Sequence, residues 1–423
     1  MTASSNQSEP PLSTNSDMTS PTTDEVSSQY RRWVYPEPIE DLPVWLKTNW
    51  QWFDPSHSHL MFWPDREKSS DLDILIAGCG TNQAAVFAHT NPQARVVGID
   101  VSQSSLNHQS YLKHKYGLEN LELLLLPIEE VGALNRDFDL IVSTGVLHHM
   151  SDPFAGMRAL ARCLRPDGVM AIMLYAHYGR IGVEILQSIF REMGLRQDES
   201  SIDVVKNTLA VLPPDHPLHS YLAIAPDLRF DAGLVDTFLH GRDRSYTVDA
   251  CLDLVASAGL VFVDWFLKAP YYPPLASANL LHSLVSELPL ERQWSIMERI
   301  NTRNACHFFT ACRPDRSADS YRIDFAMPKF LDYKPSLRHR CKITQTGISQ
   351  SSWSMPLDRT QISLLRLMDG SRTIGQILSQ ASSEGAFAKM DQESREQYGG
   401  LLFQSLWQLD FVAFGLNPEA SQA

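Results

Sequence analysis

Hydrophobic and polar residues form a repeating pattern along the middle of the chain. Short, almost continuously apolar runs, such as residues 121–126 (LELLLL) and 138–144 (FDLIVST), have the length and composition of buried strands. Apolar residues at helical spacing separate these runs. The predicted strands are residues 74–77, 94–100, 121–126, 138–144 and 168–176, and the predicted helices are residues 82–89, 103–115 and 153–164. Because strands and helices alternate, we expect an α/β fold with a parallel, doubly wound sheet.

The regions beside this repeat have different patterns. A short amphipathic helix is expected at residues 42–50, in a segment rich in Trp and Pro. Residues 177–245 have apolar positions at helical spacing and predict a helical insertion. A helix at residues 248–258 and strands at residues 260–266 and 306–314 are then expected to complete the sheet.

The C-terminal part of the chain has a third pattern. Two short helices, separated at Asp369 and Gly370, and a helix near residues 392–408 are predicted together with flanking β segments. This combination predicts a small α+β domain of winged-helix-like type. The expected domains are a disordered Ser/Thr-rich tail at residues 1–30, a main domain at residues 31–314 and an accessory domain at residues 315–423.

Charge and cysteine content restrict the possible partners and compartment. The 36 basic and 49 acidic side chains give a formal net charge of -13, which disfavours nucleic acid as a partner. The six cysteines lack C-x-x-C spacing, so we expect reduced thiols and no zinc site. The first 30 residues contain no Lys or Arg, unlike a signal or transit peptide, and no apolar run approaches the length of a membrane helix. We therefore expect a soluble, cytoplasmic protein.

The turn after the first predicted strand contains two glycines. Gly78 and Gly80 would let a ligand approach the backbone closely, but Gln83 replaces the third glycine of a dinucleotide-binding motif. Twenty residues after Gly80, the second strand ends at Asp100, whose carboxylate could accept hydrogen bonds from both hydroxyls of a ribose. The alternative role of Asp100 is to cap the helix that starts near Ser102.

These motifs together resemble the class I S-adenosylmethionine-dependent methyltransferases. The segment AGCGTN at residues 77–82 is similar to their first motif, GIDVS at residues 98–102 to their ribose-binding loop, and residues 138–175 to their fourth strand, active-site loop and fifth strand. The resemblance implies a Rossmann-like seven-stranded sheet whose last strand, residues 306–313, is antiparallel. It also implies S-adenosyl-L-methionine as cofactor and methyl transfer to an acceptor that the sequence does not identify, either a protein side chain or a metabolite.

The resemblance also implies which residues contact the methyl donor. They are Ala77, Gly78, Cys79, Gly80, Asn82, Gln83, Asp100, Val101, Ile128, Glu129 and Thr144. Two positions depart from the family. Ile76 occupies the place of an acidic residue near the amino group of the donor, and Pro127 aligns with the acidic residue that binds the adenine amino group. Glu129 is the expected substitute for the second acid, although it could equally be a solvated loop charge.

Candidate catalytic residues follow the fourth and fifth strands. His148 and His149 come after residues 138–144, at the carboxyl edge of the sheet, where one imidazole could act as a general base or orient the acceptor. Tyr175 ends the next strand at the same edge. The alternative is that these side chains pack structurally. The polar segment HGRDRSYT, residues 240–247, is either part of a lid or a solvated turn.

Other features support weaker hypotheses. His57 and His59 have a spacing that a metal could use, but no Cys or acidic cluster accompanies them, and no metal site is expected. A basic segment from Arg322 to Lys342 precedes the predicted winged-helix-like unit, and we interpret it as a solvated face or a surface for a protein partner rather than for nucleic acid. Two other functions remain open: a non-catalytic sensor of the donor or its product that acts through the C-terminal domain, and a nicotinamide-dependent oxidoreductase, which Gln83 disfavours.

Overall fold

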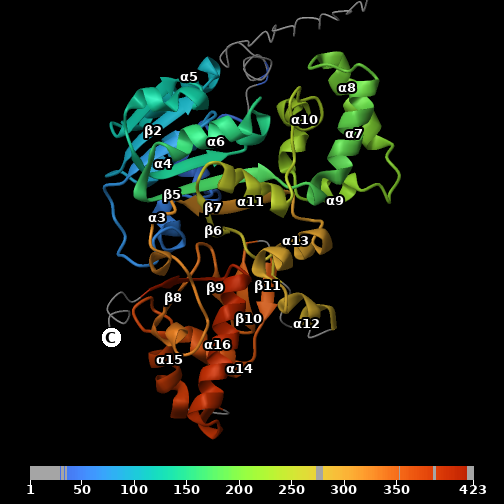
Figure 1. Ribbon diagram of the computed structural model, residues 1–423. Helices are drawn as coiled ribbons and strands as arrows, with labels where there is room; N and C mark the ends of the chain where they lie inside the picture. The colour runs from blue at the N-terminus through green and yellow to red at the C-terminus, as the bar shows by residue number, and fades with distance from the viewer. Residues whose placement is uncertain are drawn as a thin grey trace, which may run out of the picture.

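The computed structural model describes residue 29, residue 33 and residues 36–272, 280–351, 353–383 and 387–416, and every structural statement below concerns these residues. Apart from Gln29, the predicted tail at residues 1–30 lies outside them. The molecule has an upper lobe built around a large sheet and a lower lobe formed by the C-terminal residues (Figure 1). No helix in the described ranges is long and apolar enough to cross a membrane, and all six cysteines are free.

The upper lobe contains a seven-stranded sheet with the order β3-β2-β1-β4-β5-β7-β6. Its strands are β1 (Asp73–Ala77), β2 (Arg95–Asp100), β3 (Leu121–Leu125), β4 (Phe138–Thr144), β5 (Leu164–Tyr175), β6 (Val261–Trp265) and β7 (Cys306–Cys312). The first five strands run parallel, whereas β7 lies antiparallel to both β5 and β6. The predicted doubly wound sheet and the predicted antiparallel last strand are both confirmed.

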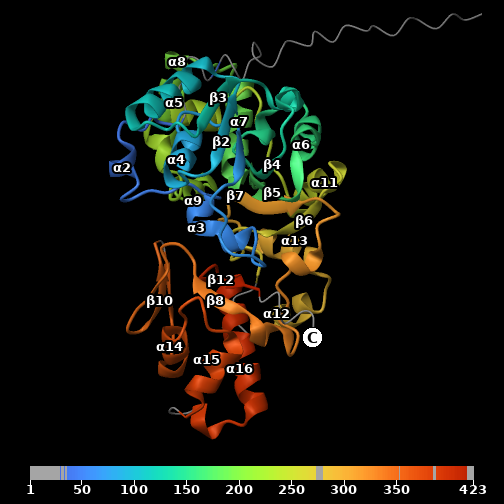
Figure 2. The same cartoon turned by 90° about the vertical axis from the view of Figure 1, so that its left-hand side faces the viewer.

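Helices cover both faces of this sheet (Figure 2). The helices of the upper lobe outside the insertion are α2 (Leu42–Trp45), α3 (Pro55–Ser58), α4 (Gln83–Thr90), α5 (Gln103–Tyr116), α6 (Pro153–Ala161), α11 (Val248–Ser257), α12 (Leu280–Ser286) and α13 (Leu290–Ile300). Alternate residues of β1 point to opposite faces: Ile74 and Ile76 pack with α4 and α5, whereas Leu75 and Ala77 pack with α6 and α11. The sheet is therefore buried on both sides, as its apolar strands require.

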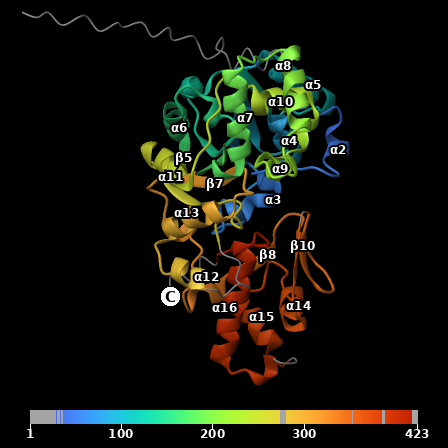
Figure 3. The same ribbon diagram turned by 90° about the vertical axis from the view of Figure 1, so that its right-hand side faces the viewer.

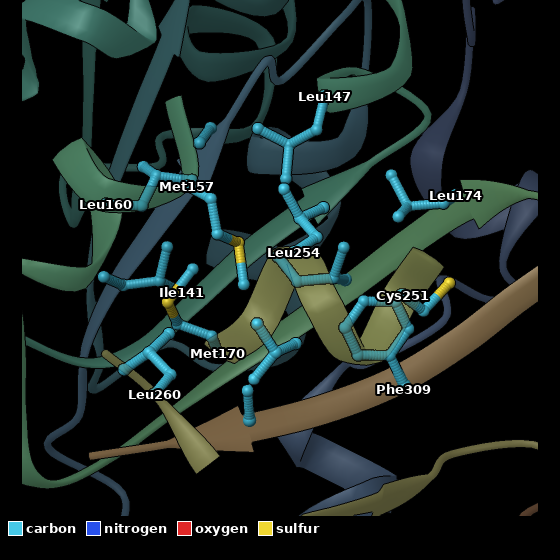
Figure 4. Packing of buried hydrophobic residues seen from close by; sticks show 14 of the residues in the cluster. Ile141, Leu147, Met157, Leu160, Met170, Leu174, Cys251, Leu254, Leu260 and Phe309 are labelled. Atoms are coloured by element: carbon cyan, nitrogen blue, oxygen red, sulfur yellow. The ribbon is translucent and has the colours of Figure 1, made fainter. Parts of the chain in front are cut away.

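On the face of the sheet that α6 and α11 cover, the hydrophobic core is formed by side chains of these helices and of the strands. Met157 and Leu160 of α6 and Leu254 of α11 lie over Ile141 and Phe309 of the sheet (Figure 4). Asp152 caps α6 by accepting a hydrogen bond from the backbone N–H of Ala155.

Two predicted helices are too long at their C-termini. α6 ends at Ala161 rather than at residue 164, because Leu164 already pairs with Phe138 as the first residue of β5. α2 ends at Trp45 rather than at residue 50. Beyond α2 the chain instead places Trp50 and Trp52 against the lower part of the lobe, where Trp52 packs on Phe308.

The insertion after β5 is helical, as predicted. Its helices are α7 (Ile181–Glu192), α8 (Glu199–Ala210), α9 (Leu218–Leu222) and α10 (Asp231–Phe238). They share a core of their own, to which Val183, Phe190, Val205 and Leu234 contribute. α7 and α8 stand beside the sheet (Figure 1), while α10 lies closer to its carboxyl edge.

The lower lobe is an α+β unit. Its helices are α14 (Arg359–Arg366), α15 (Ile374–Gln380) and α16 (Gln392–Gln408), and its strands are β8 (Lys334–Leu337), β9 (Lys342–Ile343), β10 (Gly347–Gln350), β11 (Trp353–Pro356) and β12 (Val412–Gly415). The strands form one sheet of order β11-β10-β9 and one of β12 with β8. All three predicted helices are present. The hairpin of β10 and β11 reaches up toward α3 (Figure 3).

Asp410 joins the two lobes. Its buried carboxylate accepts hydrogen bonds from the backbone N–H groups of Lys268 and Ala269, which follow β6, and it also pairs with Arg338 of the lower lobe. One carboxylate thus satisfies donors from both lobes, which fixes the lower lobe against the edge of the sheet.

Candidate functional site

A cavity opens at the carboxyl edge of the sheet, where the strand order reverses between β1 and β4. This position is the usual ligand site of open α/β sheets. Its lining residues are Pro36, Gln51, Gly78, Cys79, Gly80, Asn82, Gln83, Asp100, Val101, Ser105, Leu126, Ile128, Thr144, Gly145, Val146, His149, Met173, Tyr175 and Asp236. Of the predicted site residues, Ala77, Glu129 and His148 are not among them.

The glycine turn after β1 is built so that the backbone forms the cavity wall. Gly78 and Gly80 have φ values of 76° and 54°, which favour glycine. A Cβ atom at Gly78 would lie 2.3 Å from Cγ2 of Val146, so a side chain here is also excluded by space. Gln109 of α5 donates from Nε2 to the carbonyl oxygens of Cys79 and Gly80 at 3.0 and 3.1 Å, which holds the turn in place.

Asp100 is not the cap of α5. The cap is Ser102, whose side chain accepts the N–H of Ser105. The carboxylate of Asp100 instead accepts the backbone N–H groups of Gly80 and Ser102, both at 2.8 Å. Burial raises the pKa of Asp100, and these hydrogen bonds act in the opposite direction. Each carboxylate oxygen retains an acceptor position, so Asp100 can both fix the glycine turn and bind hydroxyl groups.

The side of the cavity next to β3 is apolar. Leu126 and Ile128 line it, directly after β3 and one strand beyond Asp100. Such a surface suits the flat face of an adenine ring. Glu129, the expected substitute for the family's acidic residue, is half-buried beside this wall but does not line it. Its role in binding the donor therefore stays a prediction.

Neutral amides occupy the region where the family has an acidic residue. Ile76 is fully buried beneath the turn. Nearby, Nε2 of Gln83 donates to the hydroxyl of Thr144 at 3.1 Å, and Nε2 of Gln51 donates to Oδ1 of Asn82 at 3.2 Å. Gln51 belongs to the segment before the sheet, so this part of the chain completes the cavity wall.

Three polar side chains meet at the opposite end of the cavity, beside β5. The hydroxyl of Tyr175 donates to Oδ2 of Asp236 at 3.3 Å, and the ring centroids of Tyr175 and His149 are 5.7 Å apart. Asp236, which is 2% exposed, comes from α10 of the insertion. Nδ1 of His149 donates to the carbonyl oxygen of Arg242 at 2.9 Å, so in the neutral ring Nε2 is the acceptor.

A second group of side chains holds Tyr175 in place. The His148 ring stacks on the Tyr175 ring at 3.9 Å, and the Arg180 guanidinium lies 3.6 Å from the centre of the same ring. Two planar groups this close to one ring cannot share a face, so Tyr175 lies between them. Arg180 also pairs with Asp243 at 2.9 Å, and Oδ1 of Asp243 is 3.9 Å from Nδ1 of His149.

The two adjacent histidines therefore have different surroundings. Burial, followed by the neighbouring His149 and Arg180, lowers the pKa of His148 well below its usual value, so this ring stays neutral. Only His149 reaches the cavity. The polar segment at residues 240–247 is not a solvated turn, because His240 is buried and Asp243 forms the buried pair with Arg180.

The histidines and aspartates at this end are close enough to form two candidate metal sites. One combines His148, His149 and Asp243, and the other combines His149, Asp236 and His240. However, the rings of His149 and His240 are stacked at 3.9 Å with 21° between their planes. Imidazole lone pairs lie in the ring plane, so stacked rings cannot both point at one ion. Arg180 already supplies the positive charge beside Asp243.

Sequence reasoning missed three polar residues of this site, which are Gln51, Ser105 and Asp236. Gln51 and Asp236 come from outside the strand-and-turn repeat, and only the folded chain brings them to the sheet edge. The available signal for Asp236 was its position as an acidic residue in an otherwise apolar helical segment, GLVDTFL at residues 233–239. An acidic residue at a core position of a helix indicates either a buried partner or a site.

Comparisons with known proteins agree with this geometry. Residues 75–170 match the family model described as a methyltransferase domain. An uncharacterised protein of Synechococcus sp. is 26% identical over 289 residues, which cover 66% of this chain and 69% of that protein. A tRNA U34 carboxymethyltransferase of Saccharophagus degradans is 33% identical over 110 residues, 26% of this chain and 34% of that enzyme. The chain thus matches only about a third of the tRNA enzyme.

A solved structure shares both lobes of the fold. PKMT2 from Rickettsia typhi, in complex with S-adenosylhomocysteine, superposes with a TM-score of 0.62 and 14% identity, covering 86% of this chain and 75% of that one. The matched residues 75–170 include the glycine turn, Asp100 at the end of β2, and β4. Residues 75–170 thus form the methyltransferase domain of a class I S-adenosylmethionine-dependent methyltransferase, and the chain carries an additional C-terminal region.

Proposed function

We propose that this enzyme transfers the methyl group of S-adenosylmethionine to a primary amine, and that the amine is a lysine side chain of a protein. The observation that carries this proposal is the trio of Asp236, Tyr175 and His149 at the end of the donor cavity beside β5. A buried carboxylate attracts an ammonium group, and a neutral imidazole can accept the proton that the amine must lose before it attacks.

The donor and the acceptor would approach from opposite ends of the cavity. Asp100 and Ile128 lie on the β2 and β3 side of the strand reversal, whereas Tyr175 lies on the β5 side. With the ribose held at Asp100, the methyl group would lie between the two ends. The chief contribution of the protein is then alignment of the amine with the methyl carbon, which can supply about 7 to 11 kcal/mol in well-oriented cases.

The chemistry is a single displacement. The amine nitrogen forms a bond to the methyl carbon while the bond from that carbon to sulfur breaks, which gives S-adenosylhomocysteine and a methylated amine. The proton of the original ammonium moves to Nε2 of His149 before the attack. Asp243, 3.9 Å from Nδ1, would stabilise the resulting imidazolium, while its pairing with Arg180 holds it in position.

The likeness to PKMT2, a protein lysine methyltransferase, supports this proposal only at the level of the fold. Four further interpretations of the sequence remain predictions. They are the domain boundaries, a protein partner at the lower lobe, a cytoplasmic location and the winged-helix-like assignment of residues 315–423. The three helices of the lower lobe agree with the last of these, while its two separate small sheets are a less usual feature.

The proposal is tested by incubating the full chain with radiolabelled S-adenosylmethionine and a protein extract. We expect label in methyllysine after acid hydrolysis, and its loss when the lysines of the extract are first acetylated. Label that persists after acetylation would contradict a lysine acceptor, and label only in small molecules would contradict a protein acceptor.

A variant pair tests the role of the trio. Asp236→Asn should lower kcat by about 100-fold while leaving the affinity for S-adenosylhomocysteine unchanged, because the carboxylate acts on the acceptor. The control is Asp231→Asn on the same helix, where the side chain is exposed. If Asp236→Asn weakens S-adenosylhomocysteine binding instead, Asp236 binds the donor amino group that Ile76 leaves without an acidic partner.

A further inference from the structure

A second and larger cavity lies between the two lobes. It has a volume of about 890 Å³, within the range of small-molecule sites. The segment before the sheet and the β6–β7 edge form its upper wall, and β8, the loop after it and the β10–β11 hairpin form its lower wall (Figure 3). Trp50 and Trp52 line it, whereas Gln51 between them lines the donor cavity.

Aromatic rings from both lobes face this space. They are Trp50, Trp52, Phe266 and Phe308 from the upper lobe and Trp353 from the lower lobe. The first four form one cluster, with Trp50 and Trp52 edge to face at 5.5 Å and Trp52 against Phe308 at 5.3 Å. Such surfaces favour a flat, apolar ligand.

The charge of the lining residues has the opposite sign to that of the whole chain. The cationic lining residues are Arg66, Lys68, Arg303, Arg338 and Arg340, and the acidic ones are Glu67 and Asp410. Asp410 is already paired with Arg338. Within the described ranges the other four cations form no ion pair. The cavity therefore presents an excess of positive charge in a protein with a net charge of -13.

The histidines of the cavity do not add to this charge. His57 and His339 stack at 4.1 Å, and burial lowers the pKa of both, that of His57 to about 4. The permanent cations are therefore guanidinium and ammonium groups. Arg340 is held with its guanidinium 4.2 Å from the centre of the Trp50 ring, so a cation and an aromatic face are presented side by side.

We infer that this interlobe cavity binds a small aromatic anion, with its ring against the tryptophan side chains that line the cavity and its anionic group at the arginines. A carboxylate and a phosphate both fit this chemistry, because guanidinium groups bind either one in a bidentate manner. The ligand is therefore either an aryl carboxylate or a nucleotide, and two probes distinguish these classes. The donor cavity is a separate site, since Asp100 and the glycine turn are not part of this one.

Calorimetry on the full chain, saturated with S-adenosylhomocysteine so that the donor cavity is filled, tests the inference. The probes are 2-naphthoate with the neutral 2-naphthamide as its match, and AMP with adenosine as its match. We expect one of the two anions to bind one-to-one, at least tenfold more tightly than its neutral match. Preference for naphthoate identifies an aryl carboxylate site and preference for AMP identifies a nucleotide site. No binding of either anion at 5 mM, or equal binding of each neutral match, would overturn the inference.

Two conservative variants locate the site. Arg303→Gln and Arg340→Gln should each weaken anion binding about fivefold, while Arg359→Gln on α14, an exposed arginine that does not line the cavity, should leave it unchanged. Arg303 lies on an exposed loop, so its replacement does not threaten the fold. Unchanged affinity in both cavity variants would place the anion elsewhere and refute the assignment.

Discussion

The two ends of the donor cavity are built in different ways. At the donor end, Gly78, Gly80 and Asp100 lie within one β-turn-helix-β unit, and the Asp100 carboxylate accepts the backbone N–H of Gly80 directly. At the acceptor end, Tyr175 is the last residue of β5, whereas Asp236 comes from the insertion. The donor end depends on local chain geometry, while the acceptor end depends on how the insertion packs against the sheet.

This difference explains how one fold can keep its donor and change its acceptor. Replacing the insertion would exchange Asp236 and the pairing of Arg180 with Asp243 without altering the glycine turn. Variants at each end should therefore have separable effects on folding, donor binding and transfer.

The largest effect is expected for Arg180→Met. Arg180 is 1% exposed and pairs with Asp243, whose side chain is 5% exposed. Removing the guanidinium leaves a buried carboxylate without its charged partner, while the Gln187 amide still donates to it. Loss of such a partner lowers the free energy of unfolding by about 3 to 5 kcal/mol. We expect a clearly lower melting temperature in differential scanning fluorimetry, against no change for Arg191→Met on the exposed side of α7. Equal melting temperatures for the two variants would show that the ion pair of Arg180 and Asp243 does not stabilise the fold.

The next effect is at the donor end. Asp100→Ala removes the proposed acceptor of two ribose hydroxyls, and charge-assisted hydrogen bonds contribute about 1.5 to 3 kcal/mol each. We expect the affinity for S-adenosylhomocysteine, measured by calorimetry, to fall about 100-fold, which corresponds to about 2.7 kcal/mol. Asp137→Ala, an exposed aspartate before β4, serves as the control. An unchanged affinity would show that Asp100 only holds the glycine turn.

The sequence predicted the donor end better than the acceptor end for a physical reason. The strands and the positions of Gly80 and Asp100 follow from patterns of adjacent residues. Asp236 could not be assigned, because nothing in a single sequence states which insertion helix returns to the sheet edge. The pair His148 and His149 could be placed at that edge but not separated. The turn after β4 buries both rings but places only His149 at the cavity.

Donor binding should also depend on pH through Asp100. Burial raises its pKa, so the carboxyl group takes up a proton at a higher pH than an ordinary aspartate. The protonated group is a weaker acceptor for the ribose, so affinity should fall as the pH falls from 7.5 to 5.0, by at most about tenfold per pH unit. Calorimetry with S-adenosylhomocysteine at several pH values measures this. In Asp100→Asn the affinity for S-adenosylhomocysteine should be weaker and independent of pH over that range. If the affinity of this variant still falls with falling pH, another group is responsible for the pH dependence.

The smallest predicted effect concerns Gln51, whose side-chain amide comes from the segment before the sheet and lines the donor cavity. Gln51 donates to Asn82 at 3.2 Å, and a single neutral hydrogen bond of this kind contributes about 0.5 to 1.5 kcal/mol. Gln51→Ala frees the Asn82 amide at the cavity wall, so it should weaken S-adenosylhomocysteine binding by about threefold and lower the melting temperature by only about a few degrees. Thr48→Ala, an exposed position in the same segment, is the matched control. If Gln51→Ala binds S-adenosylhomocysteine as tightly as the unmodified chain, the segment before the sheet contributes nothing to donor binding. The donor end would then depend only on residues of the strand-and-turn repeat, unlike the acceptor end, which depends on the insertion.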